Sequence, residues 1–352
     1  MNDIYKRLAT HLDRLPGGFP ATPNGIEIRI LKRLFTPAEA QVAASLSMQP
    51  ETVEAISGRL DMDKHKLADT LNEMARKGLI FRQTKDGQTK YMAAQFVIGI
   101  WEYHVNDLDP ELIRDFNEYV PYLVNLWSQQ NTKQLRVIPV GKSLKADVQI
   151  MPYEDAEQII GGQSKITVAP CICRKEHQMV GRGCQNPLEV CLCFGSGAYY
   201  YEENGLGRSI TKDEALDILH QAAEAGLVLQ PGNSKKTMNI CMCCGCCCQV
   251  LKNIKSLPQP AKAVNSSYYA TVDETTCVGC GICEERCPMQ AIKIEVDVAR
   301  VDPDRCIGCG VCTPTCETGA VKLTPKPKND RWEPPATVFE TYYNIAKERG
   351  LI

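Results

Sequence analysis

Apolar residues in the segment 26–95 recur at spacings that predict a series of short helices followed by a hairpin. Between residues 64 and 77 they lie three or four positions apart, which places them on one face of a helix. Thr36 precedes a proline and an acidic residue three positions on, so it predicts the start of another helix. After Gly78, two strand-like segments flank Asp86-Gly87, a pair typical of a tight hairpin turn.

This order of helices and hairpin, over about 70 residues, resembles the winged helix-turn-helix modules of transcription regulators. The resemblance implies that the helix over 64–77 would be the one to read DNA. However, residues 1–100 hold 14 basic against 11 acidic side chains, and a net charge of +3 is small for a nucleic-acid surface. Because a fold does not fix a function, we expect a docking platform for protein, and DNA stays open as the less favoured partner.

The rest of the chain mixes helical and extended patterns. A helix is expected over about 108–130, and Pro121 should end or kink it. Short strands are expected at 137–140, 148–151 and 165–169, a strand or extended piece at 227–229, and helices at 213–225 and 337–349.

We expect a multidomain α+β protein with a winged helix-turn-helix-like domain, a central α/β cysteine-rich domain and a C-terminal two-cluster ferredoxin fold. The expected limits are 1–105 for the first domain, 106–265 for the metal-binding centre, 266–324 for the ferredoxin domain, and 325–352 for an extended linker and terminal helix.

Cysteine is the outlier of the composition. All 19 cysteines lie between residues 171 and 316, and such crowded, odd-numbered runs suit soft-metal ligation better than a disulfide scaffold.

The net charge of -2 is too small to indicate binding to nucleic acid or to an anionic membrane. The N-terminal residues lack the apolar core of a signal peptide, and no apolar run approaches the roughly 20 residues of a spanning helix. We therefore expect a cytoplasmic protein with no membrane span.

The spacing C-x2-C-x2-C-x3-C occurs twice, from Cys277 to Cys287 and from Cys306 to Cys316. This doubled run closely resembles bacterial two-cluster ferredoxins, in which the fourth cysteine of each run crosses to the other cluster. The resemblance implies two 4Fe-4S clusters, one held by Cys277, Cys280, Cys283 and Cys316, and the other by Cys306, Cys309, Cys312 and Cys287. The glycines inside each run would allow the left-handed backbone angles that such wrapping needs.

The other eleven cysteines form two groups, namely Cys171, Cys173, Cys184, Cys191 and Cys193, and then Cys241, Cys243, Cys244, Cys246, Cys247 and Cys248. Neither follows the ferredoxin spacing, and free thiols at this density would be prone to oxidation. We expect one or two additional iron-sulfur clusters, with Cys171, Cys173, Cys184 and Cys191 as one ligand set and the run 241–248 as another. A structural zinc ion at one of these sets is the alternative. Cys193 and one or two members of the second run are expected to be spare thiols.

The tripeptide Cys243-Cys244-Gly245 is similar to the CCG motif of heterodisulfide reductase subunits, which bind an unusual cluster. The whole pattern, from winged helix through Ala-Pro-Cys-Ile-Cys-Arg and the 241–248 run to the ferredoxin unit, resembles multidomain ferredoxin-type iron-sulfur proteins of anaerobic bacteria and archaea. No P-loop and no complete dinucleotide fingerprint occurs, so neither a nucleotide nor a flavin is expected in this chain.

The sequence thus favours an electron carrier or electron-transfer subunit over an enzyme, passing single electrons to a partner oxidoreductase. Residues 271–320 hold nine acidic and four basic side chains, which would steer a partner with a basic docking patch. One alternative is a redox-sensing winged-helix regulator that binds DNA. Another is a reductase whose central cysteine-rich centre carries out the chemistry.

Overall fold

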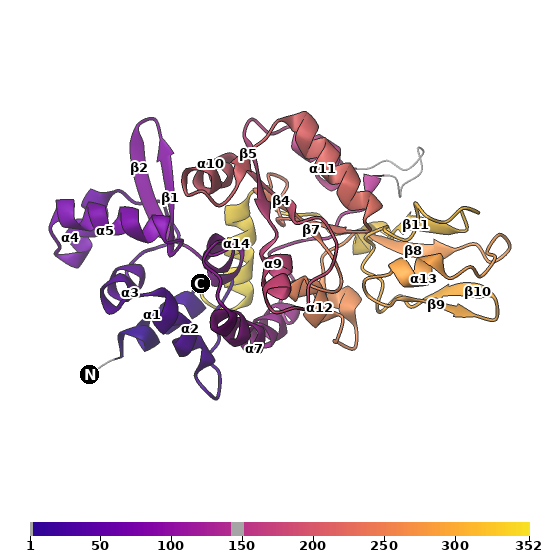
Figure 1. Ribbon diagram of the computed structural model, residues 1–352, viewed down its shortest axis with the longest axis horizontal. Helices are drawn as coiled ribbons and strands as arrows, with labels where there is room; N and C mark the ends of the chain where they lie inside the picture. Colours follow the sequence, from indigo (N-terminus) through magenta and orange to yellow (C-terminus); the bar gives the residue numbers. More distant parts are fainter. Residues whose placement is uncertain (1–2, 142–150) are drawn as a thin grey trace.

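The computed structural model describes residues 3–141 and 151–352. Figure 1 shows three parts in a row: the N-terminal helices and hairpin at one end, a central sheet with helices around it, and the doubled cysteine module at the other end. One continuous hydrophobic core joins the first two parts and enters the near half of the third, whose far half has a small cluster of its own. Among the residues described, no helix is both long and apolar enough to cross a membrane.

The N-terminal part contains the helices and the hairpin expected from the pattern. Its elements are α1 (Ile4–Asp13), α2 (Ile26–Leu34), α3 (Pro37–Ala43), α4 (Val53–Leu60), α5 (Lys64–Arg76), β1 (Ile80–Lys85) and β2 (Gln88–Ala93). Thr36 and Glu39 cap α3 reciprocally, each accepting a hydrogen bond from the backbone of the other. At the hairpin tip, Asp86 and Gly87 have φ angles of 52° and 74°, as a tight type I′ turn requires.

An irregular segment, Phe96–Ile100, and a single helical turn, α6 (Trp101–Tyr103), lead to the long helix α7 (Pro110–Ser128). Of the two outcomes expected at Pro121, an end or a kink, the first does not occur, because α7 continues for seven more residues. The proline removes the hydrogen bond to the Asn117 carbonyl but leaves the buried face intact, from Leu112 to Val124. Burial of that face outweighs the loss of one hydrogen bond.

A five-stranded antiparallel sheet forms the centre, in the order β5-β3-β4-β7-β6. Its strands are β3 (Ile166–Pro170), β4 (Glu189–Phe194), β5 (Arg208–Ser209), β6 (Val228–Pro231) and β7 (Asn239–Cys243). Around it lie α8 (Ala156–Gly161), α9 (Ile172–Met179), α10 (Gly195–Glu203), α11 (Lys212–Glu224), α12 (Gln249–Ile254) and the short turns η3 (Pro152–Glu154) and η4 (Pro260–Ala263). All strand pairings of this sheet are antiparallel. The central domain is therefore of the α+β class, and not of the α/β class that the sequence predicted.

The doubled cysteine module consists of two small antiparallel ladders and one short helix. They are β8 (Tyr268–Val272) with β11 (Val321–Pro325), β9 (Ile292–Glu295) with β10 (Val298–Val301), and α13 (Ile282–Arg286). Gly279 has a φ of 63°, and a Cβ there would lie 2.5 Å from the Asp297 carbonyl oxygen. The left-handed backbone angle expected at this position is therefore present, and the close approach leaves no room for a side chain.

The C-terminal segment returns to the N-terminal part. After the turn η5 (Lys328–Asp330), helix α14 (Val338–Glu348) lies behind the central elements in Figure 1. Arg349 donates hydrogen bonds to the Leu15 carbonyl at 2.6 Å and to Asp13 at 3.1 Å, while Glu348 accepts from Thr132. The strand expected at 148–151 lies outside the described residues except for Met151.

Candidate metal centres

Four cysteines, named here site 1, line a hollow of about 100 Å³ at the far end of the doubled cysteine module: Cys277, Cys280, Cys283 and Cys316. Backbone N–H groups point at two of the sulfurs, with Ala299 N 3.4 Å from Cys277 Sγ and Val321 N 3.4 Å from Cys316 Sγ. Burial alone would raise the pKa of Cys316, but the N–H groups of Val321 and its neighbours lower it overall. Such donors favour a thiolate, the form that ligates iron.

Four other cysteines, named site 2, surround a smaller hollow beside the central sheet: Cys287, Cys306, Cys309 and Cys312. Here Ala291 N lies 3.2 Å from Cys287 Sγ and Ala270 N lies 3.3 Å from Cys306 Sγ. Cys309 and Cys312 are 7% and 6% exposed, and burial raises the pKa of both thiols. A buried thiolate needs a positive partner, so this donor set fits iron far better than free thiols.

A third group, the tight group, lies in the central part and consists of Cys184, Cys244, Cys246 and Cys247. Their four sulfur atoms all lie within 4.8 Å of one another, and in neither site 1 nor site 2 do three sulfurs come that close. The Sγ–Sγ distance is 3.9 Å for Cys184 and Cys244 and 3.8 Å for Cys246 and Cys247. A tetrahedral ion with Zn–S bonds of about 2.3 Å separates its sulfurs by about 3.8 Å. The geometry of this group therefore fits a single tetrahedral ion.

Cys184 belongs to the tight group because the loop after α9 carries it to the turn before α12. Burial opposes ionisation of its thiol, but hydrogen bonds from Asn186 and from the neighbouring thiols lower its pKa to about 6. This placement differs from the ligand set drawn from the sequence, which grouped Cys184 with Cys171, Cys173 and Cys191.

The remaining central cysteines form a continuous run of thiols, named the thiol run: Cys193, Cys191, Cys241, Cys243, Cys248, Cys173 and Cys171. Each thiol in this order lies close enough to the next to shift its pKa. The pairing of β4 with β7 sets Cys191 directly opposite Cys241, and β3 delivers Cys171 to the same region. The neighbouring thiols Cys173 and Cys243 hold the pKa of Cys248 well below its usual value. Cys248 therefore ionises more readily than an ordinary buried thiol.

Arg174, which is fully buried, lies between the tight group and the thiol run. Burial alone would lower the pKa of this guanidinium, but the nearby sulfurs of Cys171, Cys244 and Cys243 raise it above the usual value. Its Nη2 donates to the Met242 carbonyl at 2.6 Å, whereas its buried Nε has no hydrogen-bond partner in the structure. A guanidinium here is costly unless it faces negative charge, so it indicates anionic sulfur on both sides.

Sequence reasoning missed the roles of several residues near these groups. His177 is only 6% exposed, and its Nδ1 lies 2.8 Å from the Cys173 carbonyl oxygen. Cys193, expected to be spare, ends the thiol run. The role of Arg174 as a positive charge beside the sulfurs could have been predicted, since the sequence places this arginine directly after two cysteines. The burial of His177 has no local sequence signal.

Site 2 connects to the tight group through a backbone contact. A Cβ built at Gly245, between Cys244 and Cys246, would lie 2.8 Å from both the Cβ and the carbonyl oxygen of Pro288, which follows Cys287. Two arginines reinforce the junction: Arg286 donates to the Ala223 and Glu224 carbonyls of α11, and Arg305 donates to the Lys255 carbonyl at 2.9 Å. Site 2 is thus the inner of the two ferredoxin-type sites.

Residues 276–320 match the family model of the 4Fe-4S dicluster domain. No curated protein and no solved structure matches the chain. The matched segment begins one residue before Cys277 and ends four residues after Cys316, so it contains all eight cysteines of sites 1 and 2. With this match and its cysteine groups, the chain is an iron-sulfur protein with a 4Fe-4S dicluster domain near its C-terminus.

Proposed function

We propose that the protein transfers single electrons between an external redox partner at site 1 and the thiol run, with site 2 between them. Sites 1 and 2 would each hold one 4Fe-4S cluster through the four cysteines that line it. Bound clusters of this type supply one-electron transfer, at potentials set by hydrogen bonds to sulfur and by burial. The observation that carries the proposal is the close packing of Gly245 on Pro288, which joins the loop of site 2 to that of the tight group.

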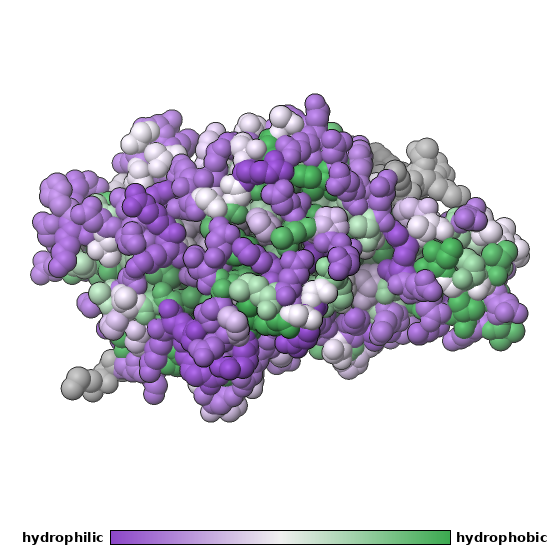
Figure 2. All heavy atoms as spheres, viewed as in Figure 1, coloured by the Kyte–Doolittle hydropathy of each residue, from purple (hydrophilic) through white to green (hydrophobic). Residues whose placement is uncertain are grey.

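Site 1 is the proposed docking point because it lies at the surface. Cys280 is exposed, and Val278 and Val296 beside it are 67% and 97% exposed. Figure 2 shows apolar atoms gathered over this end of the molecule. Acidic residues outnumber basic ones around this apolar surface, so a partner with a basic rim would be attracted to it. Such a surface suits a transient redox complex.

For the tight group we propose a structural zinc ion, and for the thiol run an additional iron-sulfur centre. The first rests on sulfur distances of 3.8 and 3.9 Å, which match tetrahedral zinc. The second rests on the crowding of seven cysteines in one run, on the lowered pKa of Cys248 and on the buried charge of Arg174. A zinc ion in the tight group would hold in place the loop around Gly245, which packs on Pro288 of site 2.

The N-terminal module serves in this proposal as a brace for the central sheet and not as a reader of DNA. Three of its cationic side chains are in ion pairs: Lys64 with Glu54, Lys77 with Glu39 at 2.8 Å, and Arg82 with Glu203 of α10 at 3.0 Å. The hydroxyl of Tyr200 in α10 also donates to the Ala75 and Ile80 carbonyls. The last two contacts hold the hairpin on the central part, and the pairing of Lys64 and Lys77 on α5 weakens the attraction of this helix for phosphate.

Anaerobic purification followed by iron, sulfide and zinc analysis tests the proposal, together with EPR spectroscopy after dithionite reduction. We expect roughly eight iron atoms from sites 1 and 2, further iron from the thiol run, one zinc ion, and spin-coupled reduced clusters. Protein that contains zinc but no iron and no sulfide would rule out electron transfer. Sequence-specific DNA binding that survives about 150 mM salt would instead favour the regulator.

A further inference from the structure

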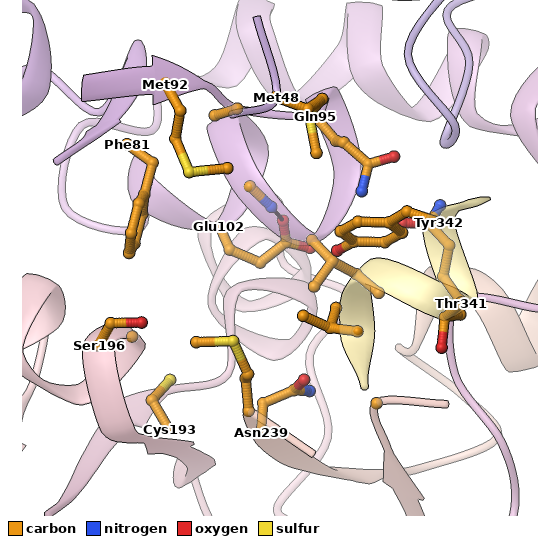
Figure 3. A pocket seen from close by; sticks show the side chains of 18 of the residues that line it. Met48, Phe81, Met92, Gln95, Glu102, Cys193, Ser196, Asn239, Thr341 and Tyr342 are labelled. Atoms are coloured by element: carbon orange, nitrogen blue, oxygen red, sulfur yellow. Dashed lines mark hydrogen bonds between the residues drawn. The ribbon is translucent and has the colours of Figure 1, made fainter. Parts of the chain in front are cut away.

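A cavity of about 220 Å³ lies where the N-terminal hairpin, the central sheet and α14 meet. Figure 3 shows its wall, with Met92 and Phe81 from the hairpin, Cys193 from β4, Ser196 from α10, and Tyr342 from α14. An engineered cavity of about 150 Å³ binds benzene, so this one can accept a molecule with one substituted ring.

The wall is apolar and aromatic over most of its area, with Met48, Phe81, Met92, Tyr103, Tyr201 and Tyr342 among its residues. No lysine, arginine or histidine belongs to the described residues that line it. An anionic ligand would lose its hydration here without gaining a cationic partner. The cavity therefore selects uncharged molecules.

Glu102 is the single acidic residue of the described wall, and it comes from an unusual stretch of backbone. Its Oε2 accepts a hydrogen bond from Gly99 N at 2.9 Å. Ile98, next to Gly99, has a φ of 57°, which is a strained angle for a β-branched residue. Glu102 retains accessible surface only because it faces the cavity, and burial raises its pKa to about 8. A strained loop that carries a protonated carboxyl into an apolar cavity is typical of a ligand site.

Two buried amides of the wall have atoms without hydrogen-bond partners. Gln95 accepts a hydrogen bond from Gly17 N through Oε1, but its Nε2 makes none of standard geometry, although the amide lies near the Tyr342 hydroxyl. Gln134 Oε1 is likewise buried and unpaired. In Figure 3 the Gln95 amide points toward the space between Glu102 and Tyr342. An unpaired buried donor is costly, so a ligand with an acceptor atom would satisfy Gln95 Nε2, whereas Gln134 Oε1 would need a donor.

The floor of the cavity is the end of the thiol run. Cys191, Cys193 and Cys241 all line it, and the Cys193 sulfur points into it in Figure 3. A ligand in the cavity would therefore contact the same group of thiols that the proposed electron transfer reaches. Because single electrons arrive there, a ligand that stabilises a one-electron intermediate suits the position.

We propose that this cavity binds and reduces a small, uncharged quinone-type carbonyl compound of single-ring size. Its ring would lie against the methionines and aromatic side chains, and its carbonyl oxygens would accept hydrogen bonds at the wall of Glu102, Gln95 and Tyr342. The inference rests on the proposed electron transfer and adds the substrate.

The reaction is balanced by two electrons and two protons. Each carbonyl oxygen gains an O–H bond, both C=O double bonds become single bonds, and the ring becomes a hydroquinone. A low-potential one-electron donor outside the chain is oxidised twice, and the protons come from solvent through the donors of the wall.

The test uses oxidised holoprotein and duroquinone, whose fully substituted ring gives thiols no position to add to. Ser196→Phe fills the cavity, while Ser256→Phe places the same side chain on the exposed surface. Equilibrium dialysis should find one saturable site per chain in the wild type and the S256F variant, and at least a tenfold weaker affinity in S196F. Absence of saturable binding, or equal binding by all three proteins, would overturn the inference.

Stopped-flow mixing of dithionite-reduced, desalted protein with duroquinone then tests the redox step. The rate of cluster oxidation should saturate with quinone concentration in the wild type and S256F, and rise linearly in S196F. Linear dependence in all three would mean random collision at the surface and would overturn the reduction step. Failure of the proposed electron transfer gives a different result. Dithionite would then produce no EPR signal of reduced clusters, while saturable quinone binding in the dialysis would remain.

Discussion

Gly245 and Pro288 meet so closely that a Cβ on the glycine would lie 2.8 Å from the proline Cβ. Each belongs to a loop with cysteines of a candidate metal centre, Gly245 between Cys244 and Cys246, and Pro288 directly after Cys287. The contact therefore fixes the position of the inner ferredoxin-type site relative to the centre of the protein.

Replacing Gly245 with alanine should force this junction apart. Because the nearest atoms include the Pro288 backbone, the free energy of unfolding should fall by about 1–3 kcal/mol, and electron transfer from site 2 to the centre should slow. Denaturant unfolding and freeze-quench EPR of the anaerobic holoprotein measure the two effects. Gly58→Ala is the matched control, since a Cβ there meets nothing within 4 Å and should stabilise helix α4 slightly. Equal stability of the two variants would contradict the prediction.

Metal analysis of two cysteine variants should separate zinc from iron. Cys184→Ala removes one sulfur of the tight group, so bound zinc should be lost while iron stays near the wild-type level. Cys280→Ser removes an exposed ligand of site 1, so iron should fall by up to about four atoms while zinc stays. Elemental analysis of both proteins checks this. Loss of iron and sulfide from C184A, with zinc absent from the wild type, would assign a cluster to the tight group.

Much of the fold follows from local sequence signals, whereas the central site does not. The Thr36 cap, the Asp86-Gly87 turn and the spacing from Cys277 to Cys287 each act over a few residues, so a local pattern predicts them. Cys191 meets Cys241 only because β4 and β7 pair in one register, 50 residues apart. Glu102 enters a cavity built from the hairpin, the sheet and α14, which no window of the sequence contains.

Removing the buried charge of Arg174 should destabilise the centre and change its redox behaviour. In Arg174→Met the thiolates of Cys171 and Cys244 lose their positive neighbour, so the free energy of unfolding should fall by about 3–5 kcal/mol. The loss of a cation also disfavours added electrons, so the potential of the central centre should become more negative. Redox titration followed by EPR measures this shift. Arg182→Met, at an exposed arginine after α9, should change neither quantity.

The raised pKa of Glu102 predicts a specific dependence of stability on pH. The folded state keeps the carboxyl proton up to about pH 8, while the unfolded chain releases it near its ordinary value of 4.5. Between these values the folded state binds more protons, so this residue makes the wild type less stable as the pH rises. Glu102→Gln has no such proton. Its stability relative to the wild type should therefore increase by about 2 kcal/mol from pH 6 to pH 8, and level off above pH 8.

Denaturant unfolding of the holoprotein at several pH values from 5 to 9 measures that difference. Glu295→Gln, at an exposed position at the end of β9, is the control, and its stability should follow the wild type at every pH. A constant difference between E102Q and the wild type would mean that Glu102 is already ionised in the folded protein at pH 6. The carboxyl would then carry a negative charge in the cavity, and a neutral quinone would find an acceptor there where the proposal requires a donor.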